Sequence, residues 1–281
     1  MNRLRNVAYC LLIGLAVCAG NATGAEDGRK PLRFGSVAMD IPAVMQYRLT
    51  PLTEYLSRQL KRPVILTLAP DMATAIKQLS NGTVDMAYLT PVAYIRSHAA
   101  GGARLIVKTV TEREASFRLM IVVRADSPIR TVADLAGKRF AFGDEAALLQ
   151  RAVVVGADMP LQRLGEYQFL GHYDNIVRGV LNRDYDAGIV KDTMAYKWEG
   201  RGIRVVYRSP ELPPYNVAVS NKVSAGLGRD IRSAFLRLRL DRPADRDVIQ
   251  ALDKNYTGFA STDDAEYNIV RRLIKPFRGD K

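Results

Sequence analysis

Residues 117–144 read FRLMIVVRADSPIRTVADLAGKRFAFGD, and this stretch decides the fold class. It contains an apolar strand pattern, a turn at Pro128, a short amphipathic step and a second apolar strand, with little chain between them. Because similar strand and helix patterns already precede residue 117, the stretch marks the entry into a second α/β lobe. A chain of 281 residues also exceeds the size at which one hydrophobic core usually stops growing, which favours two lobes.

The chain before this stretch alternates strands and helices. Strands are expected at 32–37, 64–68, 85–89 and 104–110. Apolar residues at helical spacing predict a helix between the first two strands, with a kink or a restart at Pro51, because proline lacks the amide hydrogen that an interior turn needs. Asp71 is expected to cap the next helix, and Thr90 with Pro91 to open a third.

The same alternation follows in the second lobe. Strands are expected at 139–142, 167–170 and 187–190, and helices near 146–155 and at 172–182. Return strands at 205–207 and 216–220 lead back to the first lobe, where the remaining chain is expected to pack as helices. The predicted fold class is therefore α/β, with two doubly wound lobes joined by crossing strands. The predicted boundaries are 26–117 and 220–281 for the first lobe and 118–219 for the second.

The first 25 residues have the features of a cleavable signal peptide. Arg3 and Arg5 form a basic start, residues 9–19 are apolar, and Thr23-Gly24-Ala25 supplies small residues for cleavage. The apolar run is shorter than the roughly 20 residues that cross a bilayer. We therefore expect export to the periplasm without a membrane-spanning anchor.

Both cysteines, Cys10 and Cys18, lie in this leader. Cleavage after Ala25 leaves a chain without thiols, which excludes disulfides, thiolate nucleophiles and zinc held by cysteine. The alternative is that residues 15–18, LAVC, form a lipoprotein signal that retains and lipidates Cys18. Val17 is bulkier than the small residue of such sites, so free export is favoured.

The chain is strongly basic. Its formal net charge of +12 falls to +10 when Arg3 and Arg5 leave with the leader, because every acidic residue lies beyond Ala25. The basic residues are dispersed among acidic ones, and an exported protein does not meet a chromosome, so no nucleic-acid partner is expected. A solvated surface that steers small anions explains the charge better.

Two doubly wound lobes bring strand ends and helix starts together at one place. A helix start exposes unpaired backbone N–H groups and a partial positive charge, and both suit an anion. The helix starts near 40–42, Asp71, Thr90, Asp144 and His172 are therefore candidates to face one bound ligand. Rotation of the lobes about the crossing strands would close them around it.

Three stretches of the chain carry a family resemblance. They are residues 32–37 (LRFGSV), 69–94 (APDMATAIKQLSNGTVDMAYLTPVAY) and 117–144. Together they resemble the PhnD-like periplasmic substrate-binding proteins of phosphonate, phosphite and phosphate uptake, over nearly the whole chain after the leader. The resemblance implies a type II periplasmic-binding-protein architecture, a small anionic ligand and an ABC permease as the membrane partner. We expect a monomer that needs neither a cofactor nor a metal.

The resemblance also implies several ligand-binding residues. His172 falls where the family carries a histidine of the ligand site, and Asp186 matches an acidic residue at the next strand. Tyr94 and Thr90 are placed to give a phenol and a hydroxyl to the ligand. The alternatives are that Tyr94 is packed core, Thr90 only a helix cap and Asp186 only a turn residue. The candidate set is Met39, Asp40, Met72, Thr90, Tyr94, Asp144, Ala147, His172 and Asp186.

The sequence departs from the family at the loop that grips the phosphonate. Residues 143–150 read GDEAALLQ and lack the hydroxyl side chains found there in the family, while Glu145 adds negative charge. The loss of two or three charge-assisted hydrogen bonds, each worth about 1.5 to 3 kcal/mol, would lower phosphonate affinity by orders of magnitude unless other donors replace them. Met72 stands where the family often has an aromatic residue, and Leu89 where it often has an aromatic residue or glycine. Apolar atoms there favour a ligand with a larger apolar part, and the alternative is that both residues only fill the interior of the lobe.

Enzyme activity is not expected. His98, interpreted as a surface residue, and His172 are the only histidines, and the motifs of zinc proteases, α/β-hydrolases and nucleotide-binding loops are absent from the sequence. The expected function is that of an exported solute-binding protein that closes on a small anion and presents it to an ABC permease. The alternatives are a periplasmic sensor subunit that signals to a membrane histidine kinase, and an interaction scaffold of the same fold that binds no small molecule.

Overall fold

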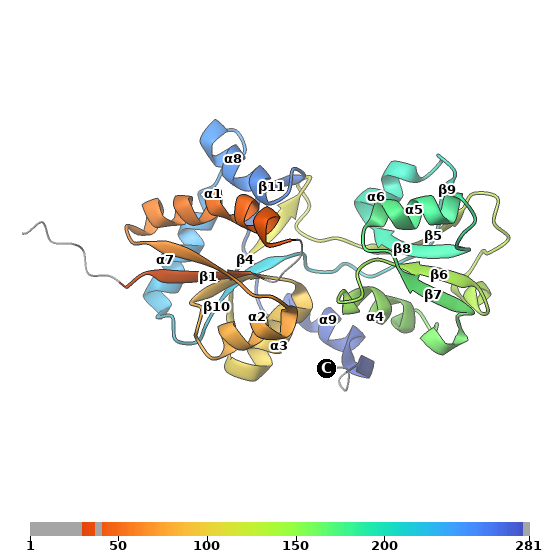
Figure 1. Ribbon diagram of the computed structural model, residues 1–281, viewed down its shortest axis with the longest axis horizontal. Helices are drawn as coiled ribbons and strands as arrows, with labels where there is room; N and C mark the ends of the chain where they lie inside the picture. Colours follow the sequence, from red (N-terminus) through yellow and green to blue (C-terminus); the bar gives the residue numbers. More distant parts are fainter. Residues whose placement is uncertain (1–29, 37–40, 278–281) are drawn as a thin grey trace, which may run out of the picture.

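The structure, a computed structural model, describes residues 30–36 and 41–277. Two sheets with helices packed on them form two lobes that lie side by side along the long axis of the molecule (Figure 1). The α/β class and the two-lobe architecture expected from the sequence are confirmed. Within the described residues, every helix is too short or too polar to cross a membrane.

The sheet of the first lobe has six strands in the order β11-β4-β10-β3-β1-β2. These strands are β1 (Leu32–Ser36), β2 (Val64–Leu68), β3 (Met86–Leu89), β4 (Arg104–Thr111), β10 (Asn216–Val219) and β11 (Tyr256–Ala260). β1 is parallel to β2 and β3, whereas β10 is antiparallel to both β3 and β4. The covering helices are α1 (Pro42–Leu60), α2 (Met72–Ser80), α3 (Pro91–Gly101), α7 (Ala225–Leu236) and α8 (Pro243–Leu252).

The sheet of the second lobe has five strands in the order β7-β6-β8-β5-β9. They are β5 (Leu119–Arg124), β6 (Arg139–Phe142), β7 (Glu166–Phe169), β8 (Ala187–Lys191) and β9 (Ile203–Arg208). The helices of this lobe are α4 (Leu148–Gly156), α5 (Tyr173–Leu181) and α6 (Asp192–Trp198). Nearly every residue of β5, β6 and β8 is buried, as the apolar runs in the sequence predict for strands covered on both faces.

The two sheets repeat one arrangement. β2-β1-β3-β10 in the first lobe corresponds to β7-β6-β8-β5 in the second, with the last strand of each group antiparallel to the rest. A carboxylate is repeated as well. Asp85 accepts a hydrogen bond from the backbone N–H of Arg33 at 2.7 Å, and Asp186 accepts one from the backbone N–H of Arg139 at 2.9 Å. Each aspartate thus fastens the start of one parallel strand to the start of its neighbour.

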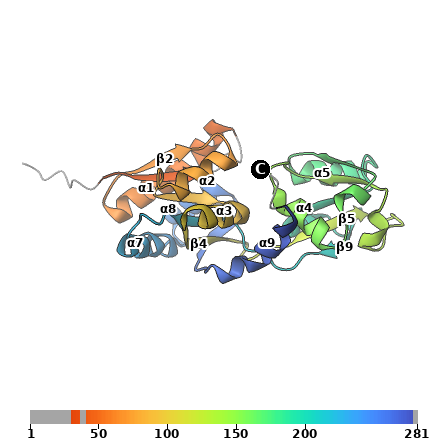
Figure 2. The same ribbon diagram turned by 90° about the horizontal axis from the view of Figure 1, so that it is seen from below.

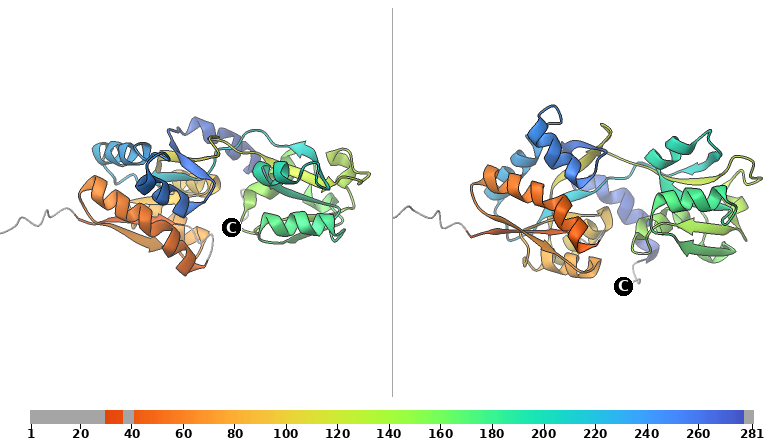
Figure 3. Two further views of the ribbon diagram at one scale, coloured as in Figure 1. Left: turned by 90° about the horizontal axis from the view of Figure 1, so that it is seen from above. Right: turned by 45° about the horizontal axis from the view of Figure 1, so that its top comes forward.

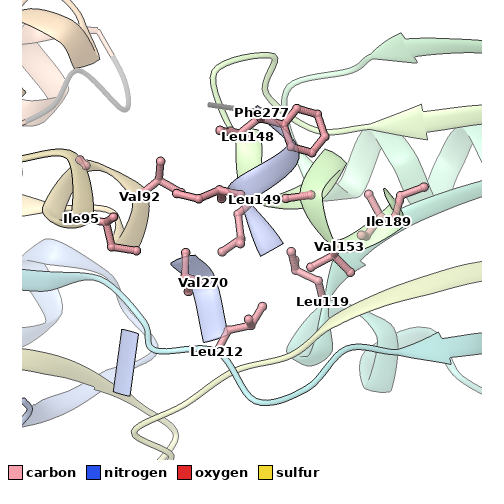
Figure 4. Close-up of a cluster of buried hydrophobic side chains, with 14 of the residues drawn as sticks. Val92, Ile95, Leu119, Leu148, Leu149, Val153, Ile189, Leu212, Val270 and Phe277 are labelled. Atoms are coloured by element: carbon pink, nitrogen blue, oxygen red, sulfur yellow. The ribbon is translucent and has the colours of Figure 1, made fainter. Parts of the chain in front are cut away.

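The lobes are joined by two crossing segments, residues 112–118 and 209–215, and by the C-terminal helix α9 (Asn268–Leu273). α9 packs on α3 of the first lobe and on α4 of the second, and it lies on the same side of the molecule as the crossings (Figures 2 and 3). Figure 4 shows Leu149 and Val270 between Val92 and Ile95 of α3 and the apolar side chains of the second lobe. One apolar cluster therefore runs through both lobes along this side.

The structure corrects four expectations about the elements. α1 is one helix that continues through Pro51 instead of restarting there. β10 belongs to the first sheet, so the second lobe ends before residue 216 and not at 219. The C-terminal part of the chain is not all helical, because β11 adds an edge strand, and α9 packs on both lobes and not on the first alone. The register of β11 shifts between Tyr256 and Gly258, and φ of Gly258 is 150°, so the strand pattern of this segment is weak in the sequence.

Candidate ligand-binding site

The carboxyl ends of the parallel strands meet the two crossings. Leu89, the last residue of β3, pairs with Asn216, the first residue after one crossing. Lys191, the last residue of β8, pairs with Leu119, the first residue after the other. The ends of both sheets that carry the helix starts therefore face each other next to the connections between the lobes (Figure 1).

The first lobe brings two of the expected residues together at this edge. Thr90 caps α3, where its hydroxyl accepts a hydrogen bond from the Ala93 N–H at 3.1 Å and lies 4.0 Å from the Met72 sulfur. Asp71 caps α2 by accepting from the Thr74 N–H at 2.7 Å, as expected. The side chains of Asp71 and Thr90 already accept hydrogen bonds from their own helices. The half-buried Met72 and Thr90 therefore form a mainly apolar surface at this edge. Met39 and Asp40 lie outside the described residues.

Tyr94 does not face this edge. Its side chain is 1% exposed, packs edge to face on Tyr267 with ring centroids 4.9 Å apart, and donates a hydrogen bond from its hydroxyl to Asp264 at 2.6 Å. Burial and the neighbouring Asp264 carboxylate raise the pKa of Tyr94, so the phenol stays protonated. In this structure the phenol of Tyr94 joins α3 to the C-terminal segment and lies apart from the other expected site residues.

The second lobe places three expected residues at its facing edge. Asp144 follows β6 and is exposed, with its carboxylate accepting from the Ala146 N–H at 2.8 Å. Ala147 precedes α4 and makes no side-chain cap. His172 precedes α5, is exposed, and likewise makes no side-chain cap, so its ring is turned to solvent. Leu148 and Leu149, by contrast, are turned into the apolar contact with α9.

Asp186 lies at the opposite end of the second sheet. It precedes β8, and its carboxylate accepts from the backbone N–H of Arg139 at 2.9 Å and pairs with the Arg139 guanidinium at 3.2 Å. Partial burial acts to raise the pKa of Asp186, but the hydrogen bonds from Arg139 outweigh it and hold this pKa below its usual range. Asp186 therefore lies apart from the other expected site residues, because β6 and β8 begin there and their carboxyl ends are on the far edge.

Three residues at the facing edges were not expected from the sequence. Lys191 ends β8 and precedes α6, the same place that Thr90 occupies between β3 and α3. Tyr173 opens α5, and Tyr215 ends the second crossing, stacked on Tyr88 with ring centroids 5.2 Å apart. A lysine directly after the apolar run AGIV was the available signal for Lys191, but the expected strand stopped at Val190.

Lys191, Tyr173 and Tyr215 are partly buried, and burial together with nearby charges shifts their pKa values. Burial, with smaller contributions from Asp144 and Asp253, raises the pKa of Tyr215 to about 12. Burial also raises the pKa of Tyr173, with Tyr215 adding to the effect. For Lys191, burial lowers the pKa, while Asp192, Asp253 and Glu112 act in the other direction. In the part of the chain that the structure describes, no group of histidine, aspartate and glutamate side chains is arranged to hold a metal ion.

A family model described as the periplasmic substrate-binding protein of a phosphonate ABC transporter matches residues 34–267. The chain belongs to this family. The phosphate-import protein PhnD of Mycolicibacterium smegmatis is 24% identical to this PhnD-like chain over 97% of its length and 95% of the relative's own. The resemblance inferred from the three sequence stretches is therefore confirmed.

Solved structures share the fold of this PhnD-like protein at low sequence identity. A Xanthomonas citri protein bound to chloride has a TM-score of 0.76 and 19% identity, with 89% of this chain and 99% of the other covered. PhnD1 of Prochlorococcus marinus in complex with methylphosphonate has a TM-score of 0.70 and 15% identity, with coverages of 88% and 98%. Membership of the family makes this a substrate-binding protein of the periplasmic ABC-transporter class, whose relatives are transport proteins and not enzymes.

Proposed function

We propose that this protein binds a small anion between its lobes in the periplasm and delivers it to an ABC permease. The arrangement at the crossings carries the proposal: the carboxyl ends of two doubly wound sheets face each other there, and Lys191, Tyr173 and Tyr215 line the edges. Anions bind where helix starts and cations converge at such an edge. The family adds support, because its members serve phosphonate transport.

Export to the periplasm is part of the proposal. Residues 1–25, with their basic start and apolar run, would direct it and leave a chain that starts at Glu26. N-terminal sequencing of the protein from a periplasmic extract tests this step. A first residue at Cys18 with a bound lipid would indicate the lipoprotein alternative, and an intact Met1 would contradict cleavage.

Ligand-induced thermal stabilisation tests the binding. The purified chain would be melted with phosphate, phosphite, alkylphosphonates, alkylsulfonates and small carboxylates. A ligand held at a hundred times its dissociation constant stabilises the folded state by about 2.7 kcal/mol, which is readily seen as a higher melting temperature. If none of these anions raises the melting temperature, the proposed binding is wrong and the scaffold alternative gains support.

The identity of the membrane partner distinguishes a role in transport from a role in sensing. Reconstitution of the protein with the permease and ATPase of its own operon should produce ligand-dependent ATP hydrolysis if it serves transport. Ligand-dependent autophosphorylation of a membrane histidine kinase without any effect on an ATPase would favour the sensor alternative. Sedimentation of the purified chain tests the expected monomer in the same preparation.

A further inference from the structure

Lys191 lies at the carboxyl end of β8, where it forms no ion pair with another described residue. It is the last residue of β8 and pairs with Leu119, directly after the first crossing. Its ammonium lies 5.5 Å from the centre of the Phe117 ring in that crossing. Among the described residues no carboxylate lies within ion-pair distance of it, although the chain forms such pairs elsewhere, for example between Arg139 and Asp186.

The surroundings of Lys191 are partly dry and net negative. Burial lowers the pKa of Lys191, so its charged form lacks part of the hydration that an exposed lysine keeps. Asp192, Asp253 and Glu112 lie near enough to favour the charge, but none contacts it. A partly desolvated ammonium that forms no ion pair with the described residues can still accept a contact from an anion outside the protein.

Two tyrosines lie at the same facing edges as Lys191, one on a crossing and one on the second lobe. Tyr215 comes from the second crossing, and its hydroxyl has no hydrogen-bond partner among the described residues. Tyr173 comes from α5, beside the Gln150 side chain, whose oxygen accepts from the Gly143 N–H at 2.7 Å. Tyr215 adds to the raised pKa of Tyr173, so the crossing and α5 contribute to one region. These phenols can donate hydrogen bonds that the loop at 143–150 cannot supply.

We propose that Lys191 binds the anionic group of the ligand and that the site prefers anions of a single charge. This inference rests on the proposed function and names the chemistry of that same site. One ammonium neutralises one negative charge. Asp144 and Asp253 act electrostatically on Tyr215, and Asp192 and Asp253 act on Lys191, so these carboxylates repel a second negative charge. A sulfonate or a carboxylate fits this balance, whereas a doubly ionised phosphonate leaves one charge unpaired.

Two probes that differ in charge but not in carbon chain test the proposal. Butanesulfonate and butylphosphonate would be titrated into the protein by calorimetry, over a pH series that passes from the singly to the doubly ionised phosphonate. The wild-type chain should bind the sulfonate more tightly. Lys191→Gln should weaken sulfonate binding about 10- to 100-fold, because one charge-assisted hydrogen bond is lost. Lys191→Arg, which keeps the charge, should retain most of the affinity.

Lys197→Gln is the matched control. Lys197 is exposed on α6, the helix that begins directly after Lys191. The substitution Lys197→Gln removes the same charge close by. Its affinity for the sulfonate should equal that of the wild type. The melting temperature without ligand should be unchanged or higher in Lys191→Gln, since a partly buried charge is removed, and Lys191→Met provides a second variant of similar shape.

The possible results distinguish a failure of this inference from a failure of the proposed function on which it rests. Equal sulfonate affinity in the wild type and in Lys191→Gln overturns the role of Lys191 and leaves the proposed function intact. Tighter binding of butylphosphonate than of butanesulfonate overturns the charge preference. If the wild type binds neither these probes nor any anion of the thermal screen, the proposed function itself fails and the inference fails with it.

Discussion

At the scale of single residues, Tyr94 shows how a side chain that a motif offers to the ligand can belong to the core. Its hydroxyl is held by Asp264, which also pairs with Arg271, and Arg271 in turn donates to the Asp264 carbonyl at 3.0 Å and to Asn268 at 2.9 Å. The motif around Tyr94 is local, whereas Asp264 lies 170 residues further along the chain. Sequence periodicity near Tyr94 therefore gives no information about which partner takes the phenol.

We predict that Tyr94→Phe lowers stability and leaves ligand binding unchanged. The substitution removes one buried hydrogen bond to a carboxylate, which costs about 1 to 2 kcal/mol. Urea unfolding would measure the loss, and calorimetry with a bound anion would measure the affinity. Tyr47→Phe is the control, because Tyr47 is 79% exposed and should show no change in stability. A clear loss of affinity in Tyr94→Phe would contradict the prediction and indicate that this phenol contacts the ligand.

The stability difference between the wild type and Tyr94→Phe should depend on pH. Partial burial acts to raise the pKa of Asp264, but hydrogen bonds from Arg271 and Tyr94 outweigh it, and this pKa lies below its usual value. A carboxylate with a lowered pKa in the folded state contributes stability above its unfolded pKa and loses it as the pH falls through its folded pKa. The two proteins should therefore converge in unfolding free energy at acidic pH, and a constant difference down to full protonation would contradict this account.

At the scale of elements, the strand and helix order was largely predictable, but the edges were not. The parallel strands are buried on both faces and read as apolar runs, so β1, β3, β6 and β8 were found close to their true bounds. β11 was missed because Gly258 and an irregular register break its strand pattern, and α6 was missed because seven residues show little helical periodicity. Of the candidate site, Met72, Thr90, Asp144, Ala147 and His172 lie at the facing edges because they follow strands. Lys191 was missed because the expected strand ended one residue before it, at Val190.

The repeated aspartate before a parallel strand should stabilise each lobe without touching the ligand. We predict that Asp186→Ala lowers the unfolding free energy by about 1 to 3 kcal/mol, because the backbone N–H and the guanidinium of Arg139 both lose their acceptor. Asp184→Ala, two residues earlier and exposed, should have little effect. The anion affinity of Asp186→Ala should match the wild type, and a selective loss of affinity would restore Asp186 to the ligand site.

At the scale of the whole molecule, the apolar contact around α9 opposes free rotation of the lobes. Val270 of α9 is fully buried, and Leu149 of α4 is 8% exposed, in one cluster with Val92 and Ile95 of α3. Closure on a ligand must preserve or rearrange this contact, whereas the two crossings alone would permit a wide range of angles. The resting separation of the lobes is therefore set by packing and not only by the length of the connections.

Spin labels on cysteines at Glu54 of α1 and Arg178 of α5 would measure that separation. Both positions are exposed and lie on different lobes, and the chain beyond the leader has no other cysteine. We predict a shorter distance when an anion binds, and a broader distribution without ligand in Leu149→Ala, since part of the contact with α9 is lost. Leu56→Ala, in the core of the first lobe, should destabilise without broadening. An unchanged distribution in Leu149→Ala would show that the contact does not restrain the lobes.

The position of β10 between β3 and β4 also governs the order in which the chain is completed during synthesis. The first sheet stays divided until residue 219 has left the ribosome, whereas the second sheet needs only the continuous segment 119–208. We expect the second lobe to form first, because domains fold as their segments emerge. Residues 225–273 follow β10 and supply α7, α8, β11 and α9, so the first lobe and the apolar contact that joins it to the second are completed last.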